Sequence, residues 1–172
     1  LMLTGAAVPV KADDVWKFDA QRFVLKEYTG TETDVVVPDT MDEGVPVKRL
    51  GTQLLAGSET LTSVVVPDSV TILDVGALSY DNNLSEITLS SNLINIGWNA
   101  ISSNDALTEL TIPASVCIID SYAVSGCYAL KKIVFEGACP LIGPEAFAML
   151  SDDVVIYVPD DQIEEYKKVF EE

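Results

Sequence analysis

Apolar residues recur along this chain with a period of 23 residues. Leu61, Leu84, Leu107 and Leu130 mark four copies in register. When each copy is numbered from its leucine, positions 4, 6, 10, 13 and 18 are apolar in all four, and position 17 is always alanine. A fixed period of this length indicates a repeat architecture. Three of the apolar columns are Val64, Ile87, Leu110 and Ile133 at position 4, Val66, Leu89, Ile112 and Phe135 at position 6, and Leu73, Ile96, Ile119 and Ile142 at position 13.

Partial copies flank the four complete ones. Upstream, Val35, Val37 and Pro38 match positions 4, 6 and 7, and the rest of that copy follows an insertion of about six residues around 41–46. Downstream, Ile156 and Val158 begin a last copy. The array therefore predicts about six rungs over residues 34–159.

Positions 3 to 6 of each rung predict a short β-strand. They alternate with period 2 and are rich in β-branched residues, so positions 4 and 6 point inward and positions 3 and 5 outward. Proline at position 7, as at Pro67 and Pro113, ends the strand because it cannot donate to the ladder. One rung cannot bury its own apolar face, whereas a stack of rungs forms a continuous core. We expect a strand-rich α/β fold: a right-handed solenoid of 23-residue rungs with one parallel sheet.

These repeats resemble the BspA-like leucine-rich repeats of bacterial surface proteins. The segment LTELTIPASVCIIDSYAVSGCYA carries the resemblance, which extends over residues 34–159. The chain departs from the family's pattern at four positions. Asp74 and Asp120 stand where other rungs have glycine, and Ser90 and Glu136 replace proline. The resemblance implies an exported binding or adhesion module, although a shared fold does not identify the partner.

Both ends of the array carry segments suited to capping it. Residues 13–33 predict a hairpin-like cap with Trp16, Phe18, Phe23 and Tyr28 in its core. Residues 160–172 predict a helix that begins with a capping box from Asp160 or Asp161 to Glu164. Its apolar face would be formed by Ile163, Tyr166 and Phe170. Residues 13–172 are thus expected to form a single domain.

The charge balance excludes several classes of function. Lys and Arg total 10 against 27 for Asp and Glu, a net charge of −17, which repels nucleic acid and anionic lipid. The chain has no histidine, which removes Ser-His-Asp and Cys-His nucleophiles and His-based zinc sites. We expect no enzymatic activity, no cofactor and no metal site.

The start of the chain predicts export. Residues 1–12 (LMLTGAAVPVKA) are typical of the end of a secretory signal peptide cleaved after Ala12, although an ordinary apolar strand is the alternative. No apolar run is long enough to cross a bilayer. The chain has an odd number of cysteines, and we interpret all three as free, buried thiols: Cys117, Cys127 and Cys139. A secreted or cell-surface monomer is expected.

The outward positions of the sheet are the candidate partner-binding site. Charged, threonine and aromatic side chains follow one another there from rung to rung, as at many protein interfaces. The partner would be an extracellular protein or glycan. A structural or spacer module with no ligand site is the alternative, since β-propensity alone accounts for threonine and valine on a solvated sheet. The candidate residues are Glu86, Thr88, Glu109, Thr111, Lys132, Val134 and Tyr157.

Two further hypotheses compete with partner binding. Glu86 and Glu109 lie one rung apart and would repel each other, or would form a glycosidase-like carboxylate pair. Carboxylates and amides at the rung corners would either form turns or bind a cation; they are Asp81, Asn82, Asn83, Asn104 and Asp105. Trp98 and Tyr122 are interpreted as a surface packing pair.

Overall fold

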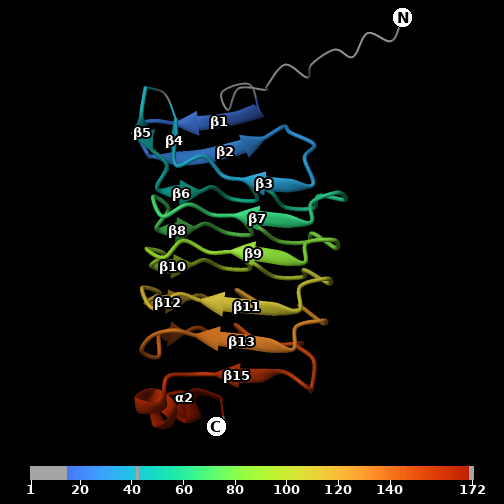
Figure 1. Ribbon diagram of the computed structural model, residues 1–172, viewed down its shortest axis with the longest axis vertical. Helices are drawn as coiled ribbons and strands as arrows, with labels where there is room; N and C mark the ends of the chain where they lie inside the picture. The colour runs from blue at the N-terminus through green and yellow to red at the C-terminus, as the bar shows by residue number, and fades with distance from the viewer. Residues whose placement is uncertain (1–14, 42, 171–172) are drawn as a thin grey trace, which may run out of the picture.

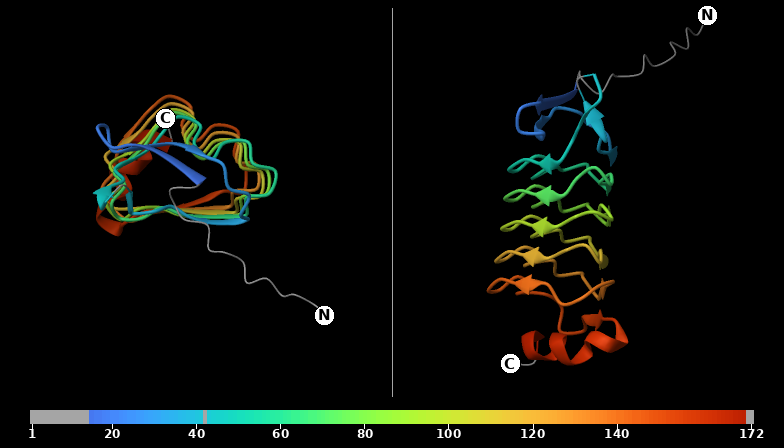
Figure 2. Two further views of the ribbon diagram at one scale, coloured as in Figure 1. Left: turned by 90° about the horizontal axis from the view of Figure 1, so that it is seen from above. Right: turned by 90° about the vertical axis from the view of Figure 1, so that its left-hand side faces the viewer.

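The computed structural model describes residues 15–41 and 43–170. The chain winds through stacked rungs that superpose when viewed along the stack (Figures 1 and 2). Each rung contributes one strand to a front wall, and each rung except the last contributes a shorter strand to a rear wall. The front strands are β3 (Asp34–Val36), β7 (Ser63–Val65), β9 (Glu86–Thr88), β11 (Glu109–Ile112), β13 (Lys132–Phe135) and β15 (Val155–Tyr157). The rear strands are β6 (Arg49–Leu50), β8 (Ile72–Leu73), β10 (Asn95–Ile96), β12 (Ile118–Ile119) and β14 (Leu141–Ile142).

The strand-rich solenoid is confirmed, but the expectation of one parallel sheet is wrong. Positions 12 and 13 of successive rungs pair in parallel in the order β6-β8-β10-β12-β14. The cap strands β1 (Trp16–Asp19) and β2 (Val24–Tyr28) extend this rear sheet to seven strands, in the order β1-β2-β6-β8-β10-β12-β14. The front wall divides into two three-stranded sheets, β3-β7-β9 and β11-β13-β15. The 23-residue period sets the register on both walls. Leu73 pairs with Ile96 at the rear, and Leu110 pairs with Ile133 at the front.

The front wall breaks between β9 and β11, which lie side by side without a ladder between them (Figure 1). In other rungs, the amide at position 3 donates to the carbonyl at position 2 of the rung before, as from Lys132 to Thr108. Among the described residues, Glu109 N makes no such bond to Ser85 O. Glu86 and Glu109 hold equivalent outward positions on the two strands that adjoin this break, and like charges on neighbouring strands disfavour close pairing.

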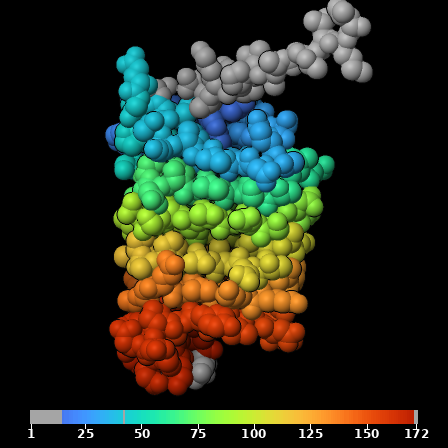
Figure 3. Space-filling model, in the orientation of Figure 1, coloured from blue at the N-terminus to red at the C-terminus, as the bar shows by residue number. Residues whose placement is uncertain are grey.

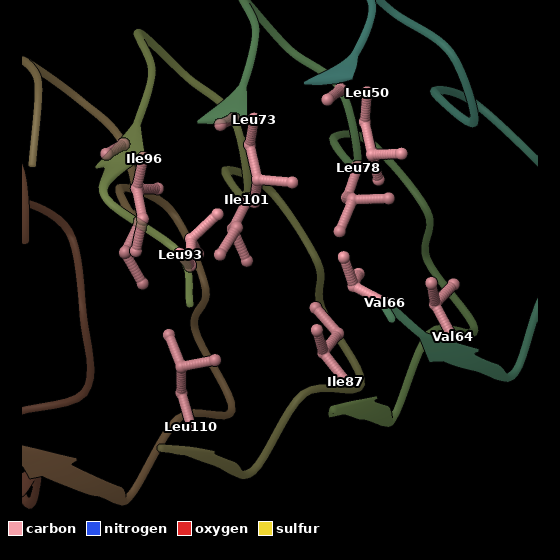
Figure 4. Close-up of a cluster of buried hydrophobic side chains, with 14 of the residues drawn as sticks. Leu50, Val64, Val66, Leu73, Leu78, Ile87, Leu93, Ile96, Ile101 and Leu110 are labelled. Carbon is pink, nitrogen blue, oxygen red and sulfur yellow. The ribbon is translucent and has the colours of Figure 1, made fainter. Parts of the chain in front are cut away.

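The core lies between the two walls and is built from the predicted columns. Figure 4 shows the position-13 residues Leu50, Leu73 and Ile96 in a row, one from each successive rung, opposite Ile87 and Leu110 of the front wall. All five are buried. Each fully buried aliphatic side chain contributes about 1.5–3 kcal/mol. This repetition from rung to rung stabilises the stack.

The N-terminal cap is a hairpin, as predicted. β1 (Trp16–Asp19) and β2 (Val24–Tyr28) pair antiparallel, and β2 continues the rear sheet by pairing in parallel with β6. Trp16 is buried against Tyr28, with ring centroids 4.3 Å apart. Phe23 is not in the cap core as expected, because it stands at the hairpin turn with 41% of its surface exposed. The insertion at 41–46 contains a second small antiparallel pair, β4 (Thr40–Met41) and β5 (Val45–Pro46).

The C-terminal cap is a helix, but it begins differently from the prediction. A 3₁₀ turn, η1 (Asp160–Gln162), leads into α2 (Ile163–Phe170), and its cap residue Pro159 makes no side-chain cap hydrogen bond. The expected capping box is therefore wrong, since Glu164 pairs with Lys167 instead. Tyr166 is buried and packs on Phe135 of the last complete rung, with ring centroids 4.8 Å apart.

Candidate functional site

The seven candidate residues all lie on the front wall, at outward positions. Glu109, Thr111, Lys132, Val134 and Tyr157 share the sheet β11-β13-β15. Thr111 is in register with Val134, and Val134 is in register with Tyr157. The remaining two, Glu86 and Thr88, stand on β9 beyond the break. The structure thus gathers five residues on one sheet and separates two.

Lys132 is the centre of this five-residue group. Its Nζ lies 3.1 Å from Glu109 Oε2 and 6.0 Å from the ring centroid of Tyr157. Tyr157 is 52% exposed, so its ring is available to a partner. Sequence reasoning left out Val155, which is exposed and pairs with Lys132. The sequence did offer a sign of this residue: Val155 is apolar at position 3, an outward position where most other rungs have a charged residue.

The front wall is broad and presents no deep cleft in Figure 3. Tyr157 borders a hollow of about 370 Å³ between β15 and α2, which Ile163 and Phe170 also line. Small-molecule sites are usually concave pockets that bury most of the ligand. The front wall is therefore better suited to a protein surface than to a small substrate.

The glycosidase-like pair is not supported by the geometry. Glu86 and Glu109 are not ladder partners, and Glu109 makes its ion pair with Lys132 while its side chain is 66% exposed. A glycosidase acid needs an environment that raises its pKa. Both carboxylates are exposed instead.

The corner residues Asp81 and Asn104 point into the core rather than outward to a cation. Both are fully buried, and the described residues contain no group of three His, Cys, Asp or Glu side chains that could hold a metal ion. They belong to a column at position 21 that continues with Cys127 and begins with Ser58. Asp81 Oδ1 accepts a hydrogen bond from Ser58 N at 2.6 Å, and Asn104 Oδ1 accepts one from Asp81 N at 3.0 Å.

Asp81 is the one ionisable carboxylate in this column. Its second oxygen, Oδ2, is buried and has no hydrogen-bond partner among the described residues. Burial raises the pKa of Asp81 to about 7, although the bonds from the Ser58 and Gly57 amides act in the opposite direction. The equivalent side chain in the next rung, Asn104, instead uses a donor, Nδ2, to bind Leu78 O at 2.8 Å and Ile101 O at 2.7 Å.

The three cysteines are free, as predicted, but only one is fully buried. Cys127 donates to Ile101 O, and burial raises the pKa of its thiol to about 11. Cys139 is half-buried, whereas Cys117 is exposed on the outer side of the rear wall. The expectation that all three are buried is therefore wrong for Cys117, because position 11 lies outside the inward columns.

The rear wall carries an apolar surface that sequence reasoning missed. Trp98 is 47% exposed and meets Tyr122 edge-to-face, with ring centroids 6.3 Å apart, so the predicted packing pair is formed. Trp98 also lines a groove of about 470 Å³ together with Ile94 and Ile118. The signal was present in the apolar residues at positions 11, 12 and 15, which the strand pattern of the front wall did not explain.

The fold and its faces define a leucine-rich-repeat solenoid. The chain belongs to the family described as the BspA type leucine rich repeat region, which matches residues 48–171 in six copies. A comparison with curated proteins found no match. In the described residues, no helix is long and apolar enough to cross a membrane.

Solved structures of bacterial proteins share this fold. A leucine-rich repeat protein from Bacteroides capillosus is 36% identical, with a TM-score of 0.58 over 66% of this chain and 86% of that one. The T. pallidum leucine rich repeat protein is 22% identical, with a TM-score of 0.58 over 94% of this chain and 95% of that one. The pneumococcal vaccine antigen PcpA is 17% identical, with a TM-score of 0.69 over 92% of this chain and 46% of that one.

Proposed function

We propose that this chain is an exported, non-enzymatic recognition module of a bacterial surface, and that the sheet β11-β13-β15 binds an extracellular protein. The observation that carries the proposal is the group of Glu109, Lys132 and Tyr157. It places a negative charge, a positive charge and an exposed aromatic ring on one sheet. Exposed aromatic residues within a charged rim are typical of protein interfaces.

Family membership and the predicted signal peptide support export to the surface. The signal-peptide prediction itself concerns residues 1–12, which lie outside the described residues. The monomeric state stays a prediction. A spacer module without a ligand site is the alternative, and it is favoured by the continuous core, which makes the stack self-supporting without a partner.

The test is a binding screen of the whole chain against a panel of extracellular-matrix proteins, at low and at physiological ionic strength. The variants are Lys132→Glu and Tyr157→Ala. Lys17→Glu in the hairpin and Tyr128→Ala in a turn are matched controls, since both residues are exposed and neither belongs to a strand of this sheet. Because exposed ion pairs contribute only about 0–1 kcal/mol, the thermal midpoint should change little.

A partner that is lost with both test variants and kept with both controls supports the proposal. Binding that survives in all four variants would place the interface elsewhere on the molecule. If no panel protein binds at either ionic strength, the spacer interpretation replaces the recognition module.

A further inference from the structure

Cationic side chains gather at one place on this strongly acidic molecule. Both arginines of the chain, Arg22 and Arg49, line a hollow of about 660 Å³ together with Lys26. The hollow lies where the hairpin joins the rear sheet, and Lys48 directly precedes Arg49 in the chain. With a net charge of −17, the rest of the protein repels anions. This hollow is where an anion is attracted.

Backbone hydrogen bonds hold these cations together although they are far apart in sequence. The carbonyl of Phe23 accepts bonds from Lys48 N at 2.9 Å and from Arg49 N at 3.1 Å. β2 and β6 then continue in parallel, so Lys26 and Arg49 rise from adjoining strands. Gly51 lets the chain after β6 approach β2 closely, because a Cβ atom there would lie 2.5 Å from Leu25 O.

The hairpin turn that presents Arg22 is anchored by Asp19. Asp19 Oδ1 accepts hydrogen bonds from Gln21 N at 3.2 Å and Arg22 N at 3.1 Å, and Oδ2 lies 2.7 Å from Lys26 Nζ. Hydrogen bonding to Lys26 lowers the pKa of Asp19, so the carboxylate stays ionised. The Asp19 carboxylate therefore fixes both the turn and the Lys26 side chain.

One of the three cations that line the hollow remains available. Asp19 pairs with Lys26, and Asp74 pairs with Arg49. Among the described residues, Arg22 has no ion-pair partner. Three cations against two carboxylates leave the hollow with an excess of positive charge.

Phe23 places an exposed aromatic ring on the same hollow. Its backbone has φ 58, a left-handed conformation that is unfavourable for a bulky residue and that glycine or asparagine adopts more easily. Eight other non-glycine residues of the described chain share this conformation, so it is a general feature of these turns. At Phe23 it keeps an exposed ring on the hollow that Arg22 and Arg49 also line.

We propose that this hollow binds an anionic sugar residue, such as a uronate or a sulfated sugar, at the end or branch of an oligosaccharide. The carboxylate or sulfate would pair with Arg22 and Arg49, since guanidinium groups bind such anions in a bidentate manner. The pyranose ring would lie on Phe23, and Gln21 and Thr52 line the hollow within reach of sugar hydroxyls.

A peptide fits this hollow less well. An extended peptide commonly binds by adding a strand to a free sheet edge. β2 has no free edge here, because it pairs with β1 on one side and β6 on the other. A long polyanion is also disfavoured, since the acidic rungs beyond the hollow repel it, whereas a short ligand senses mainly charges within about 8 Å.

The test is calorimetric titration of the whole chain with a sulfated heparin-derived tetrasaccharide at low ionic strength. Arg22→Ser should weaken binding about tenfold or more, because its charge-assisted hydrogen bonds to the anion are strong. Phe23→Asn should weaken binding severalfold while the thermal midpoint stays the same or rises, since asparagine tolerates the left-handed backbone. Lys131→Gln, on a distant rung, is the matched control and should bind as the parent chain does.

Three parallel titrations, with inorganic sulfate, an oligoglutamate peptide and a neutral chito-oligosaccharide, show which kind of ligand the hollow prefers. The proposal is overturned if the tetrasaccharide does not bind, or if inorganic sulfate binds as tightly. It is also overturned if an oligoglutamate peptide binds as tightly and with the same dependence on Arg22. A neutral chito-oligosaccharide of equal length should bind much more weakly, and equal binding would exclude the charge-based site. The Lys132→Glu and Tyr157→Ala variants should bind the sugar normally, so this site and the proposed protein-binding sheet can fail independently.

Discussion

The side chain of Asn104 accepts a hydrogen bond from the backbone amide of Asp81, 3.0 Å away, and donates through Nδ2 to the carbonyls of Leu78 and Ile101. Asp81 occupies the same column one rung earlier but offers an oxygen where Asn104 offers a donor. That oxygen is buried and unpaired among the described residues. A buried polar group without a partner costs about 1–3 kcal/mol, so the column is weakest at this rung.

Asp81→Asn should stabilise the protein at neutral pH by about 1–3 kcal/mol. The folded-state pKa of Asp81, about 7, is above its ordinary value of 3.8, so the folded state binds the extra proton between these two values. Stability of the parent chain should therefore fall as pH rises from about 4 to 7, and the loss should be complete above that window. Asparagine does not titrate and should remove this part of the pH dependence.

Urea denaturation of both proteins between pH 4 and 8, with Asp152→Asn as a control at an exposed aspartate, measures the effect. The two stability curves should converge at the acidic end and separate towards neutral pH. Parallel curves, or a variant less stable than the parent at pH 8, would contradict the role given to Asp81.

Glu86→Lys should stabilise the front wall across the break between β9 and β11. The substitution replaces a like-charge neighbour of Glu109 with an opposite charge, a change of about 0.2–1 kcal/mol. The gain should shrink at high salt because both side chains are exposed. The thermal midpoints of Glu86→Lys and of the exposed control Glu59→Lys, at low and high salt, measure it. An equal gain in both variants would indicate a general effect of net charge instead.

Tyr166 should be the main anchor of the C-terminal helix. Tyr166→Phe keeps the ring contact with Phe135 but loses the hydrogen bond from the hydroxyl to Gly137 O at 3.1 Å, which should cost about 0.5–1.5 kcal/mol. Tyr166→Ala also removes the buried ring and should cost about 3–5 kcal/mol. Urea denaturation measures both, with exposed Val169→Ala on the same helix as the control. The anchor role is wrong if Tyr166→Ala and Val169→Ala lose the same stability.

The three thiols should react in the order of their exposure. Cys117 is exposed and should be alkylated by iodoacetamide in the native protein, whereas Cys127 should react only after unfolding. Burial raises the pKa of Cys127 to about 11, which keeps the thiol protonated at neutral pH. Mass spectrometry of peptides after timed labelling gives the order. Fewer than three reactive thiols in denaturant would reveal a disulfide and contradict the free state of all three.

The candidate site could be predicted from the sequence only in part. Alternation identified which residues point outward, so Glu109, Lys132 and Tyr157 were found together. It did not show that Glu86 and Thr88 stand beyond a break, because ladder hydrogen bonds depend on how adjoining rungs meet. The same limit applies to Asp81 and Asn104. Both are residue types that commonly form turns, but here they are buried. Side-chain polarity alone does not distinguish a surface corner from a hydrogen-bonded column.

The sequence by itself determined the period, the register of the rungs and the two capping segments. These follow from the spacing of apolar residues, because every rung must bury the same positions against its neighbours. Only the tertiary structure decided that a second wall forms a seven-stranded sheet, that Phe23 is exposed and that Arg22, Lys26 and Arg49 share one hollow. The physical reason is that hydrophobic burial repeats along the chain, whereas charge clusters and strained turns arise from contacts between distant segments that no local pattern records.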